Sequence, residues 1–143
     1  MDYLLRRMQK DYLTFSEKPV RSEERAIAER LHAFVSAYNN QKIDDFIALF
    51  ADDATIESRS GGGSPKIVNN PQFSESTRKA FSRIDKIFFD NIRVLVKNTS
   101  EVHVSGILTV LLRAGRIKIK SDPLCLEFRK IATDWLITKN LYC

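Results

Sequence analysis

Apolar residues in the first half of the chain recur every three or four positions, which is the spacing of one face of a helix. This pattern predicts a long helix over residues 23–40, with Ser22 as its N-cap, and a short helix within 42–52. It also predicts a third helix over 71–83. The same spacing runs through residues 1–18, so we expect an extra N-terminal helix packed on the body of the protein.

From residue 87 onward the apolar period changes from 3.6 to 2, which is the spacing of strands. Four such runs, separated by turn signals, predict strands over 87–98, 101–113, 116–130 and 134–142. A short strand is also expected over 54–58. Because the four long runs are joined by short links, they should pair antiparallel. Helices followed by such a meander predict an α+β fold, with the helices on one side of a curved sheet.

The run over 101–113 is apolar on both of its faces. Every second residue from Val102 to Leu112 is apolar except Gly106, and Ile107 and Leu111 lie on the opposite face. A strand that is apolar on both sides needs cover on both sides. We therefore predict that the outer face of the sheet pairs with a second copy of the chain in a homodimer.

The composition fits one globular domain. The chain has 143 residues, of which 43% are apolar and 29% are charged, enough to bury a core. We divide it into an N-terminal helical extension, residues 1–20, and a main domain, residues 21–143. No run of about 18 apolar residues occurs, so we expect no membrane-spanning segment. The formal net charge of +5 is compatible with anionic partners without requiring them.

Cysteine and histidine are scarce. Cys125 and Cys143 are the only cysteines, too few for a disulfide framework, so we expect free thiols and a reducing, cytoplasmic location. His32 and His103 are the only histidines and lie on different predicted elements. A metal site needs several converging ligands, so we expect neither a metal nor a cofactor.

The stretch ALFADDATIESRSGGG, residues 48–63, leads from the short helix through the short strand into a glycine-rich loop. The overlapping stretch FVSAYNNQKIDDFIALFADDATIES, residues 34–58, resembles the corresponding part of bacterial ketosteroid isomerase. That enzyme shares a superfamily with nuclear transport factor 2 and the SnoaL-like polyketide cyclases. The resemblance covers about residues 23–142. It implies a cone-shaped α+β barrel, in which a curved, mostly antiparallel sheet wraps around helices and an apolar pocket opens between them.

The resemblance also implies where isomerase chemistry would lie. The isomerases use a tyrosine on the long helix, a carboxylate at the end of the short strand and a protonated aspartate on a late strand. These positions fall on Phe34, Ser58 and Leu126, none of which supplies the required acid or base, so we assign no catalytic residue. The residues expected to line the pocket are Phe34, Tyr38, Ile56, Ser58, Leu126 and Trp135, with Arg59 at its mouth.

The acidic residues near the predicted pocket have simpler interpretations. Alternation points Glu57 to the face opposite Ser58, and Asp52 and Asp53 are expected to serve the turn after the short helix. An ionisable side chain such as Glu127 or His32 turned into the pocket would instead indicate an enzyme.

These observations favour a non-catalytic domain that binds a small apolar ligand or serves as a dimeric interaction module. The alternative is a SnoaL-like enzyme, of isomerase, cyclase or dehydratase type, with an unidentified catalytic group. A third possibility is an adaptor that uses a basic row, Arg113, Arg116, Lys118 and Lys120. No aromatic residues interleave that row as a stacking platform requires, so we expect neither a nucleic acid nor a membrane as partner.

Overall fold

The computed structural model describes residues 12–56, 66–67, 70–112 and 119–141. The helices are α2 (Ser22–Asn39), α3 (Ile43–Ile47) and α4 (Asn70–Arg83). The strands are β1 (Leu13–Phe15), β2 (Phe50–Ile56), β3 (Lys66–Ile67), β4 (Ile84–Asn98), β5 (Glu101–Leu112), β6 (Ile119–Ile131) and β7 (Asp134–Leu141). The helices expected over 23–40, within 42–52 and over 71–83 are therefore confirmed, as are the four long strands.

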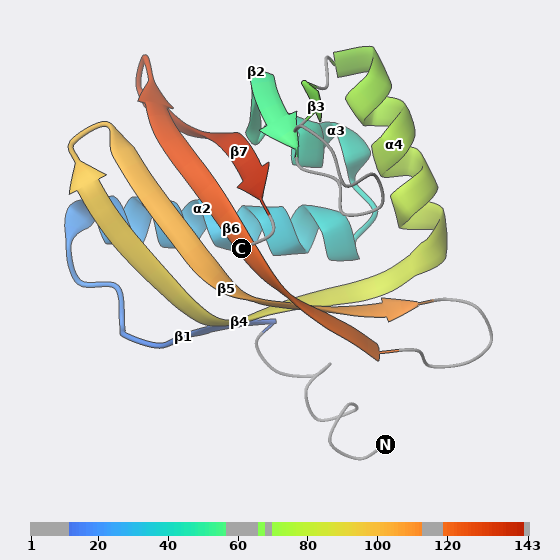
Figure 1. Cartoon of the computed structure of the whole chain (residues 1–143), viewed down its shortest axis with the longest axis horizontal. Coiled ribbons are helices and arrows are strands. Elements are labelled where there is room, and N and C mark those ends of the chain that lie inside the picture. The colour runs from blue at the N-terminus through green and yellow to red at the C-terminus, as the bar shows by residue number, and fades with distance from the viewer. Residues whose placement is uncertain (1–11, 57–65, 68–69, 113–118, 142–143) are drawn as a thin grey trace.

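The strands form one sheet in the order β1-β4-β5-β6-β7-β2-β3. The long strands β4 to β7 pair antiparallel in chain order, whereas β1 and β2 join the sheet in parallel. The sheet curves, and α2 crosses one of its faces (Figure 1). This arrangement confirms the α+β fold with a curved, mostly antiparallel sheet around helices.

The long helix α2 buries the apolar stripe that its sequence predicts. The buried members of the stripe are Ile27, Leu31, Phe34, Val35 and Tyr38. The helix begins at Ser22 itself, so the prediction that Ser22 is the N-cap is wrong by one residue. The cap is Arg21, whose main-chain N–H donates to the Glu24 carboxylate at 3.1 Å.

The end of α2 is fastened to the sheet by a buried amide. The Asn39 side chain donates to the Ile87 carbonyl at 3.1 Å and accepts from the Ile87 N–H at 2.8 Å. Lys86 Nζ donates to the Asn39 carbonyl at 2.8 Å. Because both ends of the amide are satisfied, Asn39 can be buried without an unpaired polar group.

The chain enters the sheet through β1, which pairs in parallel with β4. The helix expected over residues 1–18 is therefore wrong at 13–15, and residues 1–11 lie outside the described part of the chain. Tyr12 stacks on Phe88, with ring centroids 5.1 Å apart. Phe88 is buried on the face opposite the core, so the N-terminal segment contributes cover to that outer face.

The outer face of β5 is partly covered within the single chain. Of the two residues that motivated the dimer prediction, Leu111 is buried and Ile107 is exposed. The open part of this face thus lies toward Ile107 rather than along the whole strand.

Cys125 is disulfide-bonded, so the prediction of a free thiol there is wrong. The only other cysteine, Cys143, lies outside the described residues. The spacing of the cysteines does not reveal this, because the pairing of β6 with β7 decides it. Cys125 lies opposite Leu141, and Leu141 precedes Cys143 by two positions in the sequence. The expected reducing compartment loses its support, since disulfides persist in oxidising surroundings. No helix within the described ranges is both long and apolar enough to cross a membrane.

A β-bulge in β4 keeps apolar residues on the core face along its length. Asp90 pairs with Ile107 and Arg93 with Ser105, so Asn91 and Ile92 together oppose the single residue Gly106. Asn91 has a φ of 53° at this point. The extra residue shifts the alternation by one, which sends Ile87 and Phe89 before the bulge, and Ile92 after it, into the same core.

The bulge requires glycine at position 106. A Cβ atom there would lie 2.7 Å from Phe89 Cε1 and 2.8 Å from the Asp90 carbonyl oxygen. Gly106→Ala should therefore lower the free energy of unfolding by about 1–3 kcal/mol, because neither a fully buried ring nor a backbone carbonyl can move aside cheaply. Urea unfolding measures this loss, and Ser105→Ala on the same strand is the control. Equal stabilities for the two variants would contradict the close packing at the bulge.

Candidate functional site

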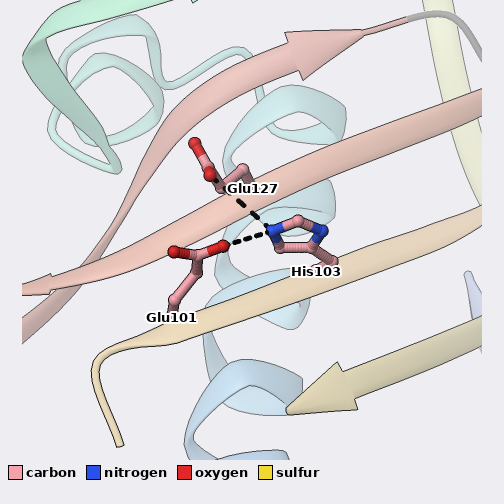
Figure 2. Close-up of side chains that lie close together, drawn as sticks. All are labelled: Glu101, His103 and Glu127. Atoms are coloured by element: carbon pink, nitrogen blue, oxygen red, sulfur yellow. Dashed lines mark hydrogen bonds and ion pairs between the residues drawn. The ribbon is translucent and has the colours of Figure 1, made fainter. Parts of the chain in front are cut away.

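Three ionisable side chains meet on the face of the sheet that points away from α2. Val104 and Leu126 pair across β5 and β6 and both belong to the core, so alternation sends His103 and Glu127 to the opposite face. Glu101 joins them from two positions earlier on β5 (Figure 2). We call these three residues the outer-face cluster.

Short contacts tie the outer-face cluster together around its imidazole. His103 Nε2 lies 2.7 Å from Glu101 Oε2 and 3.6 Å from Glu127 Oε1. The ring therefore lies between two carboxylates, and Figure 2 shows both contacts converging on the same nitrogen.

Two cations accompany the outer-face cluster. Arg129 Nη2 lies 3.3 Å from Glu101 Oε1 and 3.4 Å from Glu127 Oε1. Lys139 Nζ lies 3.9 Å from Glu127 Oε2. The two carboxylates are thus matched by two positive charges before any charge on His103 is counted.

A second bulge brings Thr138 onto Glu127. Glu127 pairs with Lys139 while the next residue, Phe128, pairs with Ile137, so Thr138 is the extra residue of β7. Its hydroxyl donates to Glu127 Oε2 at 2.8 Å. Glu127 can therefore be buried to 7% exposure with its charge satisfied.

Glu127 is held in its ionised form. Burial raises the pKa of Glu127, but the Thr138 hydrogen bond and the charges of Lys139 and Arg129 together lower that pKa below its ordinary value of 4.5. At neutral pH this group is a fixed carboxylate, which suits it to accept hydrogen bonds or bind a cation rather than to donate a proton.

A groove runs beside the outer-face cluster. It has a cavity volume of about 670 Å³ and is lined in part by His103, Ser105, Glu127 and Lys139. The connection after β1, at Ser16 and neighbouring residues, forms another part of its wall. A small molecule or ion can therefore reach His103 from this groove.

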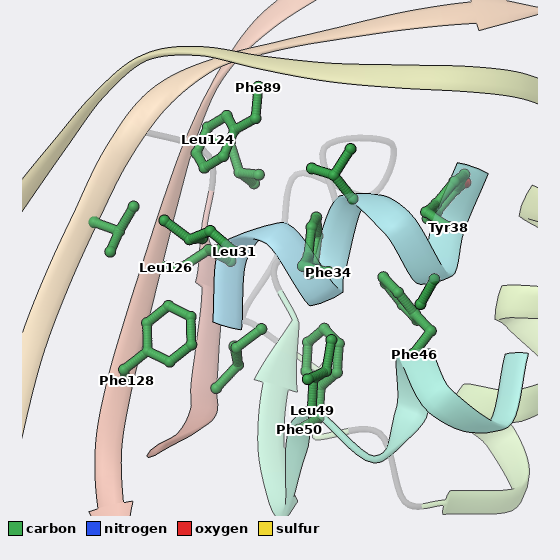
Figure 3. Close-up of a cluster of buried hydrophobic side chains, with 14 of the residues drawn as sticks. Leu31, Phe34, Tyr38, Phe46, Leu49, Phe50, Phe89, Leu124, Leu126 and Phe128 are labelled. Atoms are coloured by element: carbon green, nitrogen blue, oxygen red, sulfur yellow. The ribbon is translucent and has the colours of Figure 1, made fainter. Parts of the chain in front are cut away.

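Aromatic rings pack against one another on the side of the sheet that faces α2. The ring of Phe34 lies 5.0 Å from that of Phe46 and 6.4 Å from that of Phe50, measured between centroids. The ring of Tyr38 lies 4.4 Å from that of Phe81. Figure 3 shows Phe34, Tyr38, Phe46 and Phe50 gathered at the contact of α2 with α3 and β2. Phe34 and Tyr38, two of the predicted pocket residues, are thus members of this core.

Of the other predicted pocket residues, Leu126, Trp135 and Ile56 lie within the described part of the chain and Ser58 does not. Leu126 and Trp135 are buried in the same core, and Leu126 also touches the groove. Ile56 is in β2. Glu57, Ser58 and Arg59 lie outside the described residues, so the pocket lining and the Arg59 mouth stay predictions.

Among the residues whose burial the structure describes, Glu127 is the buried charged side chain, and the phenol of Tyr38 is also buried. The other buried polar residues are Asn39 and Thr77, which do not titrate. His32 is exposed, so it does not turn into the interior. Asp52 and Asp53 are exposed and form part of β2 rather than the turn expected for them.

Sequence reasoning considered His103 and Glu127 separately and missed the outer-face cluster. Two strands had to be placed in register before the pair could be recognised, because 24 positions separate the two residues. The spacing of Glu101 and His103, two positions apart in a predicted strand, was the one available signal, since such residues share a face.

Comparisons with known proteins identify the fold. No protein-family model and no curated protein matches the sequence. Three solved structures illustrate the likeness. A candidate calcium/calmodulin dependent protein kinase II association domain from Xanthomonas campestris superposes with a TM-score of 0.74, at 15% identity over 92% of this chain and 94% of its own. A ketosteroid isomerase-like protein from Erwinia carotovora atroseptica gives 0.71, at 17% identity over 85% and 95%. An NTF-2 like protein of unknown function from Shewanella oneidensis gives 0.66, at 14% identity over 82% and 96%.

The chain has the NTF2-like fold. The resemblance seen around residues 48–63 is thereby confirmed at the level of architecture. At identities below 25% the likeness concerns the fold alone, because NTF2-like folds host unrelated activities.

The filled interior can be tested at Phe34. Phe34→Tyr, which places a hydroxyl where the isomerases carry one, should lower the free energy of unfolding by about 1–3 kcal/mol, because the hydroxyl would be buried among apolar rings. Thermal or urea unfolding measures the loss. Phe15→Tyr, at a half-buried ring of β1, is the control. A Phe34→Tyr protein as stable as the control would indicate an open space beside this ring.

The ionised state of Glu127 makes a prediction about pH. A carboxylate whose pKa is lower in the folded than in the unfolded protein stabilises the fold above about 4.5, and this stabilisation is lost as the pH falls through its folded pKa. Glu127→Gln should therefore cost about 1–2 kcal/mol near pH 7, and its difference from the unmodified protein should shrink below about pH 4.5. Urea unfolding across a pH series measures the difference. Glu29→Gln, at an exposed carboxylate of α2, is the control; a Glu127→Gln difference that stays constant down to about pH 3 would contradict the lowered pKa.

Proposed function

We propose that this protein is a non-catalytic NTF2-like interaction module that assembles as a homodimer through the outer face of its sheet. The observation that carries the proposal is the pair of apolar side chains, Leu95 and Ile107, exposed on that face. Leu95 is 55% exposed and Ile107 is 37% exposed, although both belong to central strands of the sheet.

The position of these two residues supports a common surface. Leu95 pairs with His103, and Ile107 lies on β5 four positions beyond His103. Both point away from the core, because Val94, next to Leu95, and Leu108, next to Ile107, pack against it. Large apolar side chains on a central part of a sheet favour a partner that removes them from water.

The charges on this face also suit a second copy of the chain. A two-fold axis places each patch against itself, so a self-pairing surface needs both signs of charge. The outer-face cluster supplies two carboxylates beside Arg129 and Lys139. Two such clusters brought together can exchange partners without leaving an excess of one sign.

The ring packing around Phe34 and Tyr38 supports assembly over binding of a ligand between these described residues. The rings of Phe34, Tyr38 and Phe46 contact one another where the isomerase resemblance implies a pocket. A small apolar ligand would have to displace these contacts. Burying the outer face in a dimer requires no such rearrangement.

A SnoaL-like enzyme is the weaker candidate. Its chemistry needs an acid or base inside the cone, whereas the buried carboxylate of Glu127 lies on the opposite face. The buried phenol of Tyr38 packs against Phe46 and Phe81. The two other positions implied by the isomerases that fall within the described residues, Phe34 and Leu126, are apolar and buried.

The oligomeric state tests the proposal. Light scattering after size-exclusion chromatography should give the mass of two chains at concentrations of tens of micromolar. Leu95→Lys combined with Ile107→Lys should give one chain, because a charge in each half of the interface would be buried without a partner. Val20→Lys, at an apolar residue that is 66% exposed in the connection before α2, is the matched control and should stay dimeric.

A single chain for the unmodified protein would overturn the proposal. An equal loss of the dimer in the Val20→Lys control would also overturn it, because the contact would then not depend on the sheet face.

A further inference from the structure

We propose that Glu101, His103 and Glu127 form a binding site for a divalent transition-metal ion such as Zn²⁺. All three ligands come from one chain, and they lie on the face proposed for the dimer, so zinc binding is measured on the Leu95→Lys, Ile107→Lys protein as well as on the unmodified chain. The cluster supplies one imidazole nitrogen and two carboxylates, a donor set that zinc accepts.

The backbone places the three donors in a compact triangle. Their ligand atoms lie within 4.8 Å of one another, and His103 Nε2 is 3.6 Å from Glu127 Oε1. Two ligands bound at about 2.1 Å can be no more than about 4.2 Å apart. Side-chain movements of about 1 Å therefore suffice, with Glu101 exchanging its hydrogen bond to Nε2 for a bond to the metal.

The strands restrict how far the donors can move. Glu101 and His103 share a face of β5, and Glu127 is paired directly with His103 across β6. The Thr138 hydrogen bond holds Glu127 from the side away from the imidazole and leaves its other oxygen, Oε1, toward His103. The Thr138 hydroxyl thus fixes the orientation of the Glu127 carboxylate, as hydrogen bonds to metal ligands do in metal sites generally.

Two of the ligands are open to an incoming ion. His103 is partly exposed and borders the groove, and Glu127 lines the same groove. Three protein ligands leave a coordination position open toward the groove, which water or a small anion can occupy.

Arg129 and Lys139 compete with the metal. Their charges already balance the two carboxylates, so a bound cation must displace them or tolerate their repulsion. Both side chains are about half exposed, 53% for Arg129 and 51% for Lys139. Their contacts of 3.3–3.9 Å are longer than those of strong charge-assisted hydrogen bonds, so the two cations can turn toward water at small cost.

Because of this competition, substitutions at the site should change the metal affinity in opposite directions, which non-specific binding would not produce. Removing the positive charge of Arg129 should strengthen metal binding, whereas removing a ligand should weaken it. A single charge about 5 Å from a divalent ion changes its affinity by about fivefold in water after screening.

The experiment is a calorimetric titration of Zn²⁺ into the chelator-treated full chain at pH 7.5. We expect one zinc ion per chain. His103→Ala and Glu127→Gln should each lower the affinity about tenfold or more, and Arg129→Gln should raise it about fivefold. His32→Ala is the matched control, because it removes the other histidine, which is exposed on α2. Circular dichroism of each variant checks that the fold is retained.

Three results would overturn the proposal. They are an absence of zinc binding up to about 1 mM, an equal loss of affinity in His32→Ala and His103→Ala, and weaker binding by Arg129→Gln. If Glu127→Gln does not fold, the Glu101→Gln protein takes its place with the same expected loss.

Discussion

The pairing of β5 with β6 determines what each face of the sheet presents. Val104 opposite Leu126, and Val102 opposite Phe128, supply part of the core that packs against α2. The same register sets His103 opposite Glu127 on the other face. A slip of one residue in this pairing would exchange the two sets. The carboxylates and the imidazole would then lie against the rings of α2, and burying them there would strongly destabilise the fold. The core therefore fixes the position of the charged cluster, and the two features are consequences of one alignment.

The same alignment separates this chain from the isomerases it resembles. The cone architecture is present, yet Phe34 and Leu126 lie at two of the positions where the resemblance implies polar groups. Both residues belong to one core, in which aromatic contacts join α2, α3 and α4. Glu101, His103 and Glu127 instead lie on the opposite face of the sheet, away from α2.

Periodicity alone predicts α2, α4 and the four long strands, because each buries one clear apolar face. It does not predict β1, because Tyr12 and Phe15 fit a helical stripe and only the contact with β4 decides between helix and strand. The bulge opposite Gly106 is likewise hidden, since the shift in alternation of β4 depends on two residues facing one across the sheet. The outer-face cluster and the disulfide of Cys125 were missed for the same reason. Both depend on the register between strands, which alternation within a single strand does not reveal.

A crystal structure of the full chain tests most directly whether the ionisable chemistry lies on the outer face and the interior is closed. The account predicts the Glu127 carboxylate within hydrogen-bonding distance of Thr138 and beside the His103 ring, with the rings of Phe34, Tyr38 and Phe46 in contact behind the sheet. Electron density for a ligand between those rings, or a Glu127 side chain directed toward α2, would contradict it.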